Sequence, residues 1–211
     1  MSKKFYMISL DPAQLHDYSA LAVIEKEGST YRIVSLTRRQ RLPYTEIVAW
    51  AQKVYFNPKF REDVAHAPAF LLDVGGVGRA IADMFTALKV PVTAIQLTGG
   101  ETETKDGDTY HVSKSLLIGR FLRAWDEGRV QMPSRASFLG MLQAELRAFR
   151  GEMSSQGRVR FEAEQGEHDD LVLSVAQAVW WGETRPKPAP CLVMPRAPEK
   201  IKPAWRVASY R

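Results

Sequence analysis

Short apolar runs rich in β-branched and aromatic residues recur through the first part of the chain, and their spacing restricts the fold more than any other feature. Residues 4–10, 20–26 and 31–37 are such runs, and a Glu-Gly-Ser turn sequence at 27–29 separates the last two. Apolar runs joined by short turn sequences are typical of neighbouring strands. The sequence therefore predicts an antiparallel three-stranded meander at the start of the chain.

After residue 40 the pattern alternates between helical and extended segments. Compact apolar runs at 69–74 and 91–97 indicate buried strands, and a glycine turn at 75–78 follows the first of them. Residues 99–112 indicate a hairpin or loop, because glycines and charged residues interrupt the apolar pattern. A meander followed by alternating helices and strands predicts a mixed sheet flanked by helices, an α/β layer fold. Helical spacing of apolar residues predicts helices over 44–56, 79–88, 113–127, 136–150 and 168–181.

Length and composition suit one globular domain, since 211 residues with 45% hydrophobic side chains are enough for a sizeable core. We find neither an apolar run near the roughly 18 residues of a membrane span nor a secretory leader. The sequence thus predicts a soluble intracellular protein with no membrane partner. Cys191 is the single cysteine and has no partner for a disulfide or zinc site.

Positive charge is concentrated at the end of the chain. Residues 185–211 carry a net charge of +6 and six of the twelve prolines, which leaves −1 of the total +5 for residues 1–184. Proline-rich, basic sequences favour an extended arm. We therefore divide the chain into a folded domain, 1–184, and a tail, 185–211, which either serves as a linker or contacts DNA or a partner.

Four aspartates occupy the ends of predicted elements. Asp11 follows the first strand, Asp73 ends the run at 69–74, and Asp169 and Asp170 begin the last helix. Hard divalent cations prefer carboxylate oxygens, and two such ions about 3.5–4 Å apart are suited to phosphodiester hydrolysis. Each aspartate also has a simpler interpretation, as a turn residue or as a first-turn helix acid. It is their combination that predicts a metal site.

The chain resembles a known family at three stretches in particular. These are Ser-Leu-Asp-Pro at 9–12, Leu-Leu-Asp-Val-Gly-Gly-Val-Gly at 71–78, and Gly-Glu-His-Asp-Asp-Leu-Val at 166–172. Together with weaker matches they resemble, over about residues 5–182, the nuclease domain of the large terminase subunit of tailed bacteriophages. This domain has an RNase H-like (RuvC-like) fold.

The resemblance implies cleavage of double-stranded DNA with little sequence preference, by two Mg²⁺ or Mn²⁺ ions, during genome packaging in the cytoplasm of an infected bacterium. It implies that His168 is an accessory group near the scissile phosphate and that Lys114 contacts a phosphate or orients water. The implied partners are the small terminase subunit, the portal and a packaging ATPase domain, with the isolated chain a monomer. The implied metal ligands are Asp11, Asp73, Asp169 and Asp170.

Complete large terminases also contain a packaging ATPase. This chain has no Gly-x-x-x-x-Gly-Lys-Ser/Thr motif, and the glycines at 75–78 have neither the spacing nor the lysine of a phosphate-binding loop. We therefore expect no motor activity from it. The chain is either an excised domain or a stand-alone nuclease.

Other functions remain open from the sequence. A RuvC-type resolvase would use similar acids as a dimer on branched DNA, and a sugar-kinase or actin-like domain would need two duplicated halves. A non-catalytic scaffold would bind DNA through the tail, with the aspartates as caps. Basic residues near predicted strand ends, Arg38 among them, are either DNA-backbone contacts or solvated surface charges. The histidines at 16, 66 and 111 share no metal-binding spacing.

Overall fold

The computed structural model describes residues 4–14, 17–61, 67–133, 137–153, 159–163 and 168–184. The predicted tail at 185–211 with Cys191, and also His16 and His66, lie outside the described residues. No helix in the described segments combines the length and the apolar character that crossing a membrane requires.

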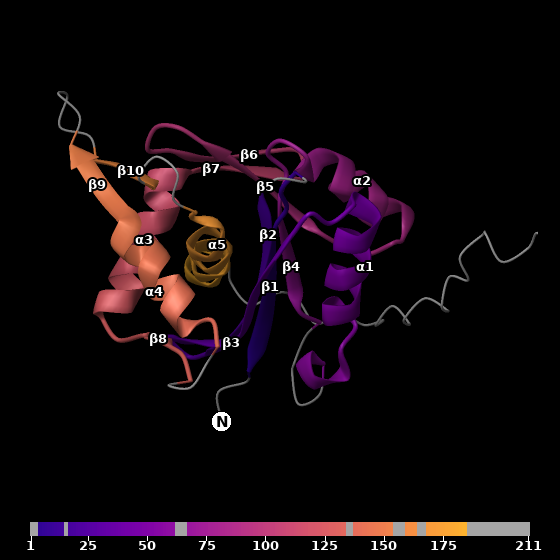
Figure 1. Cartoon of the computed structure of the whole chain (residues 1–211), viewed down its shortest axis with the longest axis horizontal. Helices are drawn as coiled ribbons and strands as arrows, with labels where there is room; N and C mark the ends of the chain where they lie inside the picture. Colours follow the sequence, from indigo (N-terminus) through magenta and orange to yellow (C-terminus); the bar gives the residue numbers. More distant parts are fainter. Residues whose placement is uncertain are drawn as a thin grey trace, which may run out of the picture.

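An eight-stranded mixed sheet forms the centre of the molecule (Figure 1). The first three strands form the predicted antiparallel meander, and β1 also pairs in parallel with β4, which starts a run of parallel strands through β5 to β7. The mixed sheet predicted from the sequence is therefore confirmed. In spatial order the strands are β6 (Glu103–Asp106), β7 (Thr109–Ser113), β5 (Thr93–Thr98), β4 (Ala69–Asp73), β1 (Phe5–Asp11), β2 (Tyr18–Glu27), β3 (Thr30–Gln40) and β8 (Val130–Gln131).

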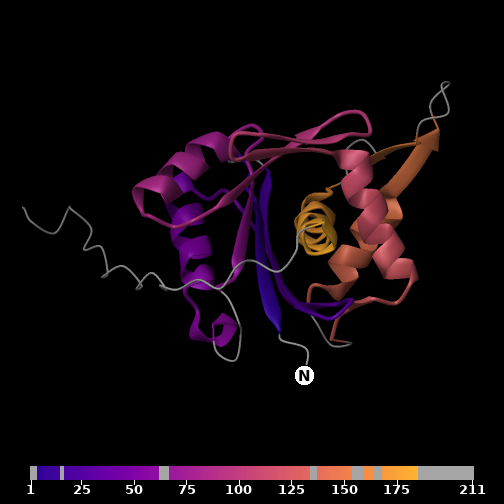
Figure 2. The same ribbon diagram turned by 180° about the vertical axis from the view of Figure 1, so that it is seen from behind.

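Helices cover both faces of this sheet, as Figures 1 and 2 show from opposite sides. The helices α1 and α2 lie on one face, and α3, α4 and α5 lie on the other. All five predicted helices are present, although their ends differ from the predicted ones. Their bounds are α1 (Tyr44–Tyr55), α2 (Gly78–Ala87), α3 (Lys114–Asp126), α4 (Leu139–Ala148) and α5 (Asp170–Thr184), with a short 3₁₀ turn, η1, at Pro58–Phe60.

Alternation along the strands separates two apolar cores. In β1, Met7 packs toward α3 and α5, whereas Ile8 packs toward α1 and α2, as expected because successive strand residues point to opposite faces. In β4, Leu71 and Leu72 divide in the same way. Odd-numbered residues of both strands therefore face α5.

The helix α5 lies between the sheet and the pair α3 and α4 (Figure 2). Its residues from Leu171 to Trp180 are buried on every side, which explains why its sequence is apolar almost throughout. Ala20 and Ala22 of β2 belong to the same core, and their small side chains let the helix approach the sheet closely. This packing fixes where α5 begins.

Two regions differ from the sequence prediction. The helix expected over 136–150 ends at Ala148, and the chain continues into a separate two-stranded sheet, β9 (Phe149–Met153) with β10 (Val159–Ala163). The segment 99–112 is a hairpin, as expected, but its second strand, β7, also joins the central sheet beside β5. The turn between β6 and β7 contains Gly107 at φ +55°, a conformation that glycine adopts without strain.

Candidate active site

Asp11 and Asp73 end two adjacent parallel strands, β1 and β4. The pairing places Leu10 beside Leu72, so the aspartate that follows each leucine lies beside the other, although 62 positions separate them in the sequence. Both occupy the odd-numbered set of positions that faces α5. Two carboxylates from distant parts of the chain thus meet at the carboxyl edge of the sheet, as the sequence predicted.

A buried hydrogen bond fixes α5 against the same strands. Ser9 donates from its hydroxyl to Oε1 of Gln177 at 2.9 Å, and both side chains are fully buried. Ser9 lies two residues before Asp11 and on the same face of β1. Gln177 lies seven residues after Asp170, which is two helical turns along the same face of α5. This bond therefore directs Asp170, at the helix start, toward Asp11.

The electrostatics of Asp11 show how closely these acids gather. Burial raises the pKa of Asp11 well above its usual range, and the charges of Asp73, Asp170 and Asp169 raise it further, while Lys114 opposes them. A carboxylate that is surrounded by like charges and partly removed from water, as Asp11 is at the end of β1, favours its protonated form. The four predicted acids thus act on one another within a single site.

Asp73 and Asp170 share this environment. Burial raises the pKa of Asp73, and the N–H of Gly75 and the charge of Lys114 only partly offset it. Burial, together with the charge of Asp169, raises the pKa of Asp170 to about 6. Burial is the largest cause of both shifts, and the nearby positive charges do not outweigh it.

The turn that follows Asp73 holds its carboxylate at the site. Oδ1 of Asp73 accepts from the N–H of Gly75 at 2.7 Å, which is the turn role considered from the sequence. The backbone then folds back so closely that a Cβ on Gly78 would lie 1.9 Å from the carbonyl oxygen of Asp73. Glycine at 78 therefore lets α2 begin directly behind the carboxylate, and the turn holds Asp73 in place.

Lys114 contacts the start of α5. Its Nζ lies 2.6 Å from Oδ2 of Asp169. Lys114 begins α3, and the hydroxyl of Ser113 caps that helix by accepting from the N–H of Leu116. The ordered helix start thus places an ammonium group between the sheet edge and α5, so the structure brings Lys114 to the predicted acids.

His168 lies at the rim of the same site. Its Nδ1 is 3.7 Å from Oδ2 of Asp170, and its ring meets the ring of Tyr18 edge to face, with centroids 4.9 Å apart. The His168 side chain is 43% exposed. It can therefore reach a bound molecule while remaining beside the acids.

The acids fit a hard divalent cation in chemistry and in charge. Each acid offers carboxylate oxygens as metal ligands. Oδ2 of Asp170 is buried without a hydrogen-bond partner, a costly state that a bound cation would relieve. Among the described residues, however, no three His, Cys, Asp or Glu side chains converge as a ready-made metal-binding group.

Two residues near the site were not predicted as part of it. Glu145 of α4 accepts hydrogen bonds from the N–H groups of Leu171 and Val172, at 2.9 and 3.1 Å. Arg38 of β3 pairs with Glu145 at 3.0 Å, and its side chain is 20% exposed, so it is more than a solvated surface charge. Periodicity gives no signal for such pairs, because the partners belong to different elements.

No protein-family model matches the chain. The large terminase subunit of Thermus virus P23-45 is 28% identical over 173 residues, which cover 82% of this chain and 31% of that protein. The chain therefore spans about a third of the length of this curated relative.

Solved structures extend the similarity to the fold. Crystal structures of the large terminase nuclease from thermophilic phage G20c, one with bound cobalt and one with bound magnesium, have TM-scores of 0.61 and 26% identity over 84% of this chain and 81% of theirs. The Thermus phage P74-26 large terminase nuclease domain has a TM-score of 0.62 over 88% of this chain and 83% of its own, at 24% identity. The RNase H-like fold and the resemblance to terminase nuclease domains are thus confirmed.

Proposed function

We propose that this chain is the nuclease domain of a phage large terminase, a divalent-metal-dependent endonuclease that cleaves double-stranded DNA with little sequence preference. The observation that carries the proposal is the meeting of Asp11 and Asp73 at one sheet edge with Asp169 and Asp170 at the start of α5, where their charges raise the pKa of Asp11. The similarity to terminase nucleases, some with bound divalent metal, supports it.

The four aspartates would hold the ions. When bound, two such cations activate a water for attack on phosphorus and neutralise the leaving oxygen. Asp11 and Asp73 hold the sheet side of the site through the paired strand ends. Asp169 and Asp170, at the start of α5, hold the other side of the site. The Ser9–Gln177 hydrogen bond fixes the position of α5. Both sides are parts of the rigid core, which suits groups that must keep a fixed separation.

Lys114 and His168 supply the neighbouring polar groups. Lys114, 2.6 Å from Asp169, would exchange part of that contact for a DNA phosphate, because an ammonium group binds phosphate as a point charge. His168 lies at the exposed rim beside Asp170. It would donate a hydrogen bond to an oxygen of the scissile phosphate.

The biological setting follows from the same similarity. The chain matches about a third of a large terminase subunit, so in the cell the nuclease would work with a packaging ATPase domain, the small terminase subunit and the portal. The site of action would be the cytoplasm of an infected bacterium. We propose that the isolated domain is a monomer, and that residues 185–211 form a basic tail that follows the folded domain.

Cleavage of supercoiled plasmid tests this function. We expect the wild type to nick and linearise the plasmid with Mg²⁺ or Mn²⁺ and to be inactive in chelator. The variant Asp73→Asn keeps an oxygen that accepts from Gly75 but loses the charge, and we expect its rate to fall by about 1,000-fold. Asp83→Asn makes the same substitution at an exposed position of α2 and should cut like the wild type.

Two results would contradict the proposal. Cutting by Asp73→Asn at the wild-type rate would show that the activity comes from elsewhere. A strong preference for a four-way junction over a linear duplex would favour the resolvase alternative.

A further inference from the structure

The start of α5 is capped from another helix. The first N–H groups of a helix have no partner within it and need acceptors, which a side chain at the helix start usually provides. Here Oε2 of Glu145, 26 positions earlier in α4, accepts from Leu171, and it also accepts from Val172. Glu145 is 5% exposed, so this cap is part of the core.

This arrangement leaves the two aspartates of the helix start available for other contacts. Asp169 is in the position from which a side chain commonly caps a helix, yet its Oδ2 accepts from Lys114 at 2.6 Å. Asp170 directs its buried Oδ2 toward His168 at 3.7 Å. Because Glu145 satisfies the N–H groups, both carboxylates can serve the site.

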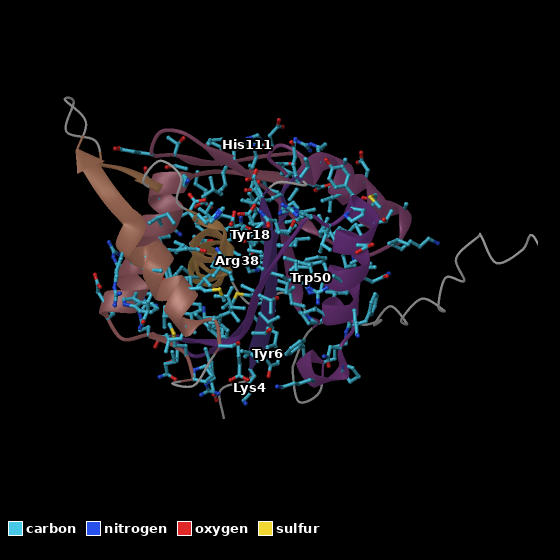
Figure 3. The ribbon with its side chains drawn as sticks, in the orientation of Figure 1. Lys4, Tyr6, Tyr18, Arg38, Trp50 and His111 are labelled. Atoms are coloured by element: carbon cyan, nitrogen blue, oxygen red, sulfur yellow. The ribbon has the colours of Figure 1, made fainter. Side chains whose placement is uncertain are left out.

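Arg38 connects this cap to the rim of the site. Its Nη1 pairs with Oε1 of Glu145 at 3.0 Å, and its guanidinium lies over the ring of Tyr18, 4.4 Å from the centroid. The ring of Tyr18 also meets the ring of His168 edge to face. Figure 3 shows Tyr18 and Arg38 next to each other beside α5. A continuous set of contacts thus runs from Glu145 to His168.

The pairing with Arg38 offsets part of the cost of burying Glu145. A carboxylate removed from water is costly unless it is paired and hydrogen-bonded. Glu145 has one oxygen on Arg38 and the other on two backbone N–H groups. Loss of either partner would leave its charge poorly compensated near Asp170.

We propose that Glu145 and Arg38 are positioning residues that hold the start of α5 so that Asp169 and Asp170 face Asp11 and Asp73. This inference rests on the proposed nuclease function. Groups behind metal ligands commonly fix their orientation, and their loss typically costs about 10–100-fold in metal affinity or activity. Neither residue touches the substrate in this account.

The test uses Glu145→Gln and Arg38→Gln in the full chain. Glutamine at 145 keeps a carbonyl oxygen for the N–H groups but loses the charge that pairs with Arg38. The control is Glu25→Gln, which removes another buried carboxylate, also paired with an arginine, Arg32, on the central sheet. Two quantities are measured: the Mn²⁺ concentration that gives half of the rise in Tm, and kcat and KM on linear duplex DNA.

We expect Glu145→Gln to need about 10-fold more Mn²⁺ and to lose about 10–100-fold in kcat, with KM for DNA nearly unchanged. Arg38→Gln, at a partly exposed position, should change both quantities in the same direction. If Glu145→Gln does not fold, Arg38→Gln alone decides the matter. Glu25→Gln should keep the wild-type Mn²⁺ midpoint and kcat.

Wild-type midpoints and kcat in both test variants would overturn the positioning role while leaving the nuclease proposal intact. Equal losses in Glu25→Gln would also overturn it, because they would show a general effect on the fold. A folded wild type that neither binds Mn²⁺ nor cuts DNA would overturn both proposals.

Discussion

A cluster of charged residues lies near each end of the paired strands β1 and β2, and the two clusters differ in their balance of charge. At one end Glu25 is buried among partners: Tyr6 donates to it at 2.7 Å, Arg32 pairs with it at 2.7 Å and Lys4 at 3.3 Å. At the other end Asp11 is surrounded by the carboxylates of Asp73, Asp169 and Asp170. Figure 3 labels Lys4 and Tyr6 at the Glu25 end of the sheet.

The pKa values of the two clusters move in opposite directions. Burial would raise the pKa of Glu25, but hydrogen bonds from Tyr6 and Lys4 and the charges of Lys4 and Arg32 outweigh it and lower the pKa. Burial and like charges act together on Asp11 and raise its pKa. The protein can therefore satisfy a buried carboxylate on these strands. The acidic cluster near the other end of these strands is only partly compensated, by Lys114, which indicates a site for a cation rather than a failure of packing.

The largest expected difference between the two clusters is in how variants at each respond to divalent metal. Relative to the wild type in chelator, Mn²⁺ at 100 times its dissociation constant should stabilise the wild type by about 2.7 kcal/mol and raise its Tm. Glu25→Gln should show the same increment from its own starting point. Asp11→Asn should show little or none, because it loses a ligand. Equal increments in all three proteins, measured by thermal unfolding, would place the metal elsewhere.

Loss of charge at the compensated end should reduce stability. Glu25→Gln leaves Arg32 and Lys4 without their carboxylate, and we expect a loss of roughly 1.5–3 kcal/mol at pH 7, the usual range for hydrogen bonds to charged groups. Chemical unfolding in chelator measures it. An unchanged free energy of unfolding would mean that the Glu25 cluster contributes nothing to the fold.

The stability that Glu25→Gln loses should depend on pH in a defined direction. Because the folded protein lowers the pKa of Glu25 below 4.5, its stabilising effect is present above that pH and disappears as the pH falls through the lowered pKa. The difference between Glu25→Gln and the wild type should therefore be full at pH 6–7 and should shrink below about pH 4. If the stability difference between the wild type and Glu25→Gln instead grew as the pH fell, the pKa of Glu25 would be raised in the folded protein, contrary to this prediction.

Loss of charge at the partly compensated end should have the opposite and smaller effect. Ionised Asp11 is disfavoured in the folded protein because its pKa is raised, so Asp11→Asn should increase stability in chelator at pH 7. In a chain of this size each 1 kcal/mol of added stability would raise the Tm by about 2–4 °C. A decrease would indicate that Asp11 serves the fold as Glu25 does.

Much of the site could be predicted because its acids coincide with local signals. Asp11 and Asp73 follow apolar runs that end as strands, and Asp169 and Asp170 begin a strongly periodic helix. The ends of adjacent parallel strands meet at one edge, so these local signals also predict proximity. The resemblance of the same stretches to a nuclease family gave the chemistry.

The remaining features depend on contacts between distant elements. Glu145 caps a helix 26 positions later, and nothing in the periodicity of α4 distinguishes it from a surface glutamate. The pairing of Glu25 with Lys4 and Arg32 depends likewise on strand register. The sheet of β9 and β10 was also missed, because the helical pattern over 136–150 extended past the end of α4. Tertiary contacts, rather than local preference, decide such features.

Anomalous scattering from crystals soaked in Mn²⁺ tests the central claim most directly. We expect manganese peaks in contact with the carboxylates of Asp11 and Asp73 and with those at the start of α5, and no peak at Glu25, whose charge is already paired. A crystal with full soaking that showed no manganese at Asp11 and Asp73, or showed it only elsewhere, would contradict the account.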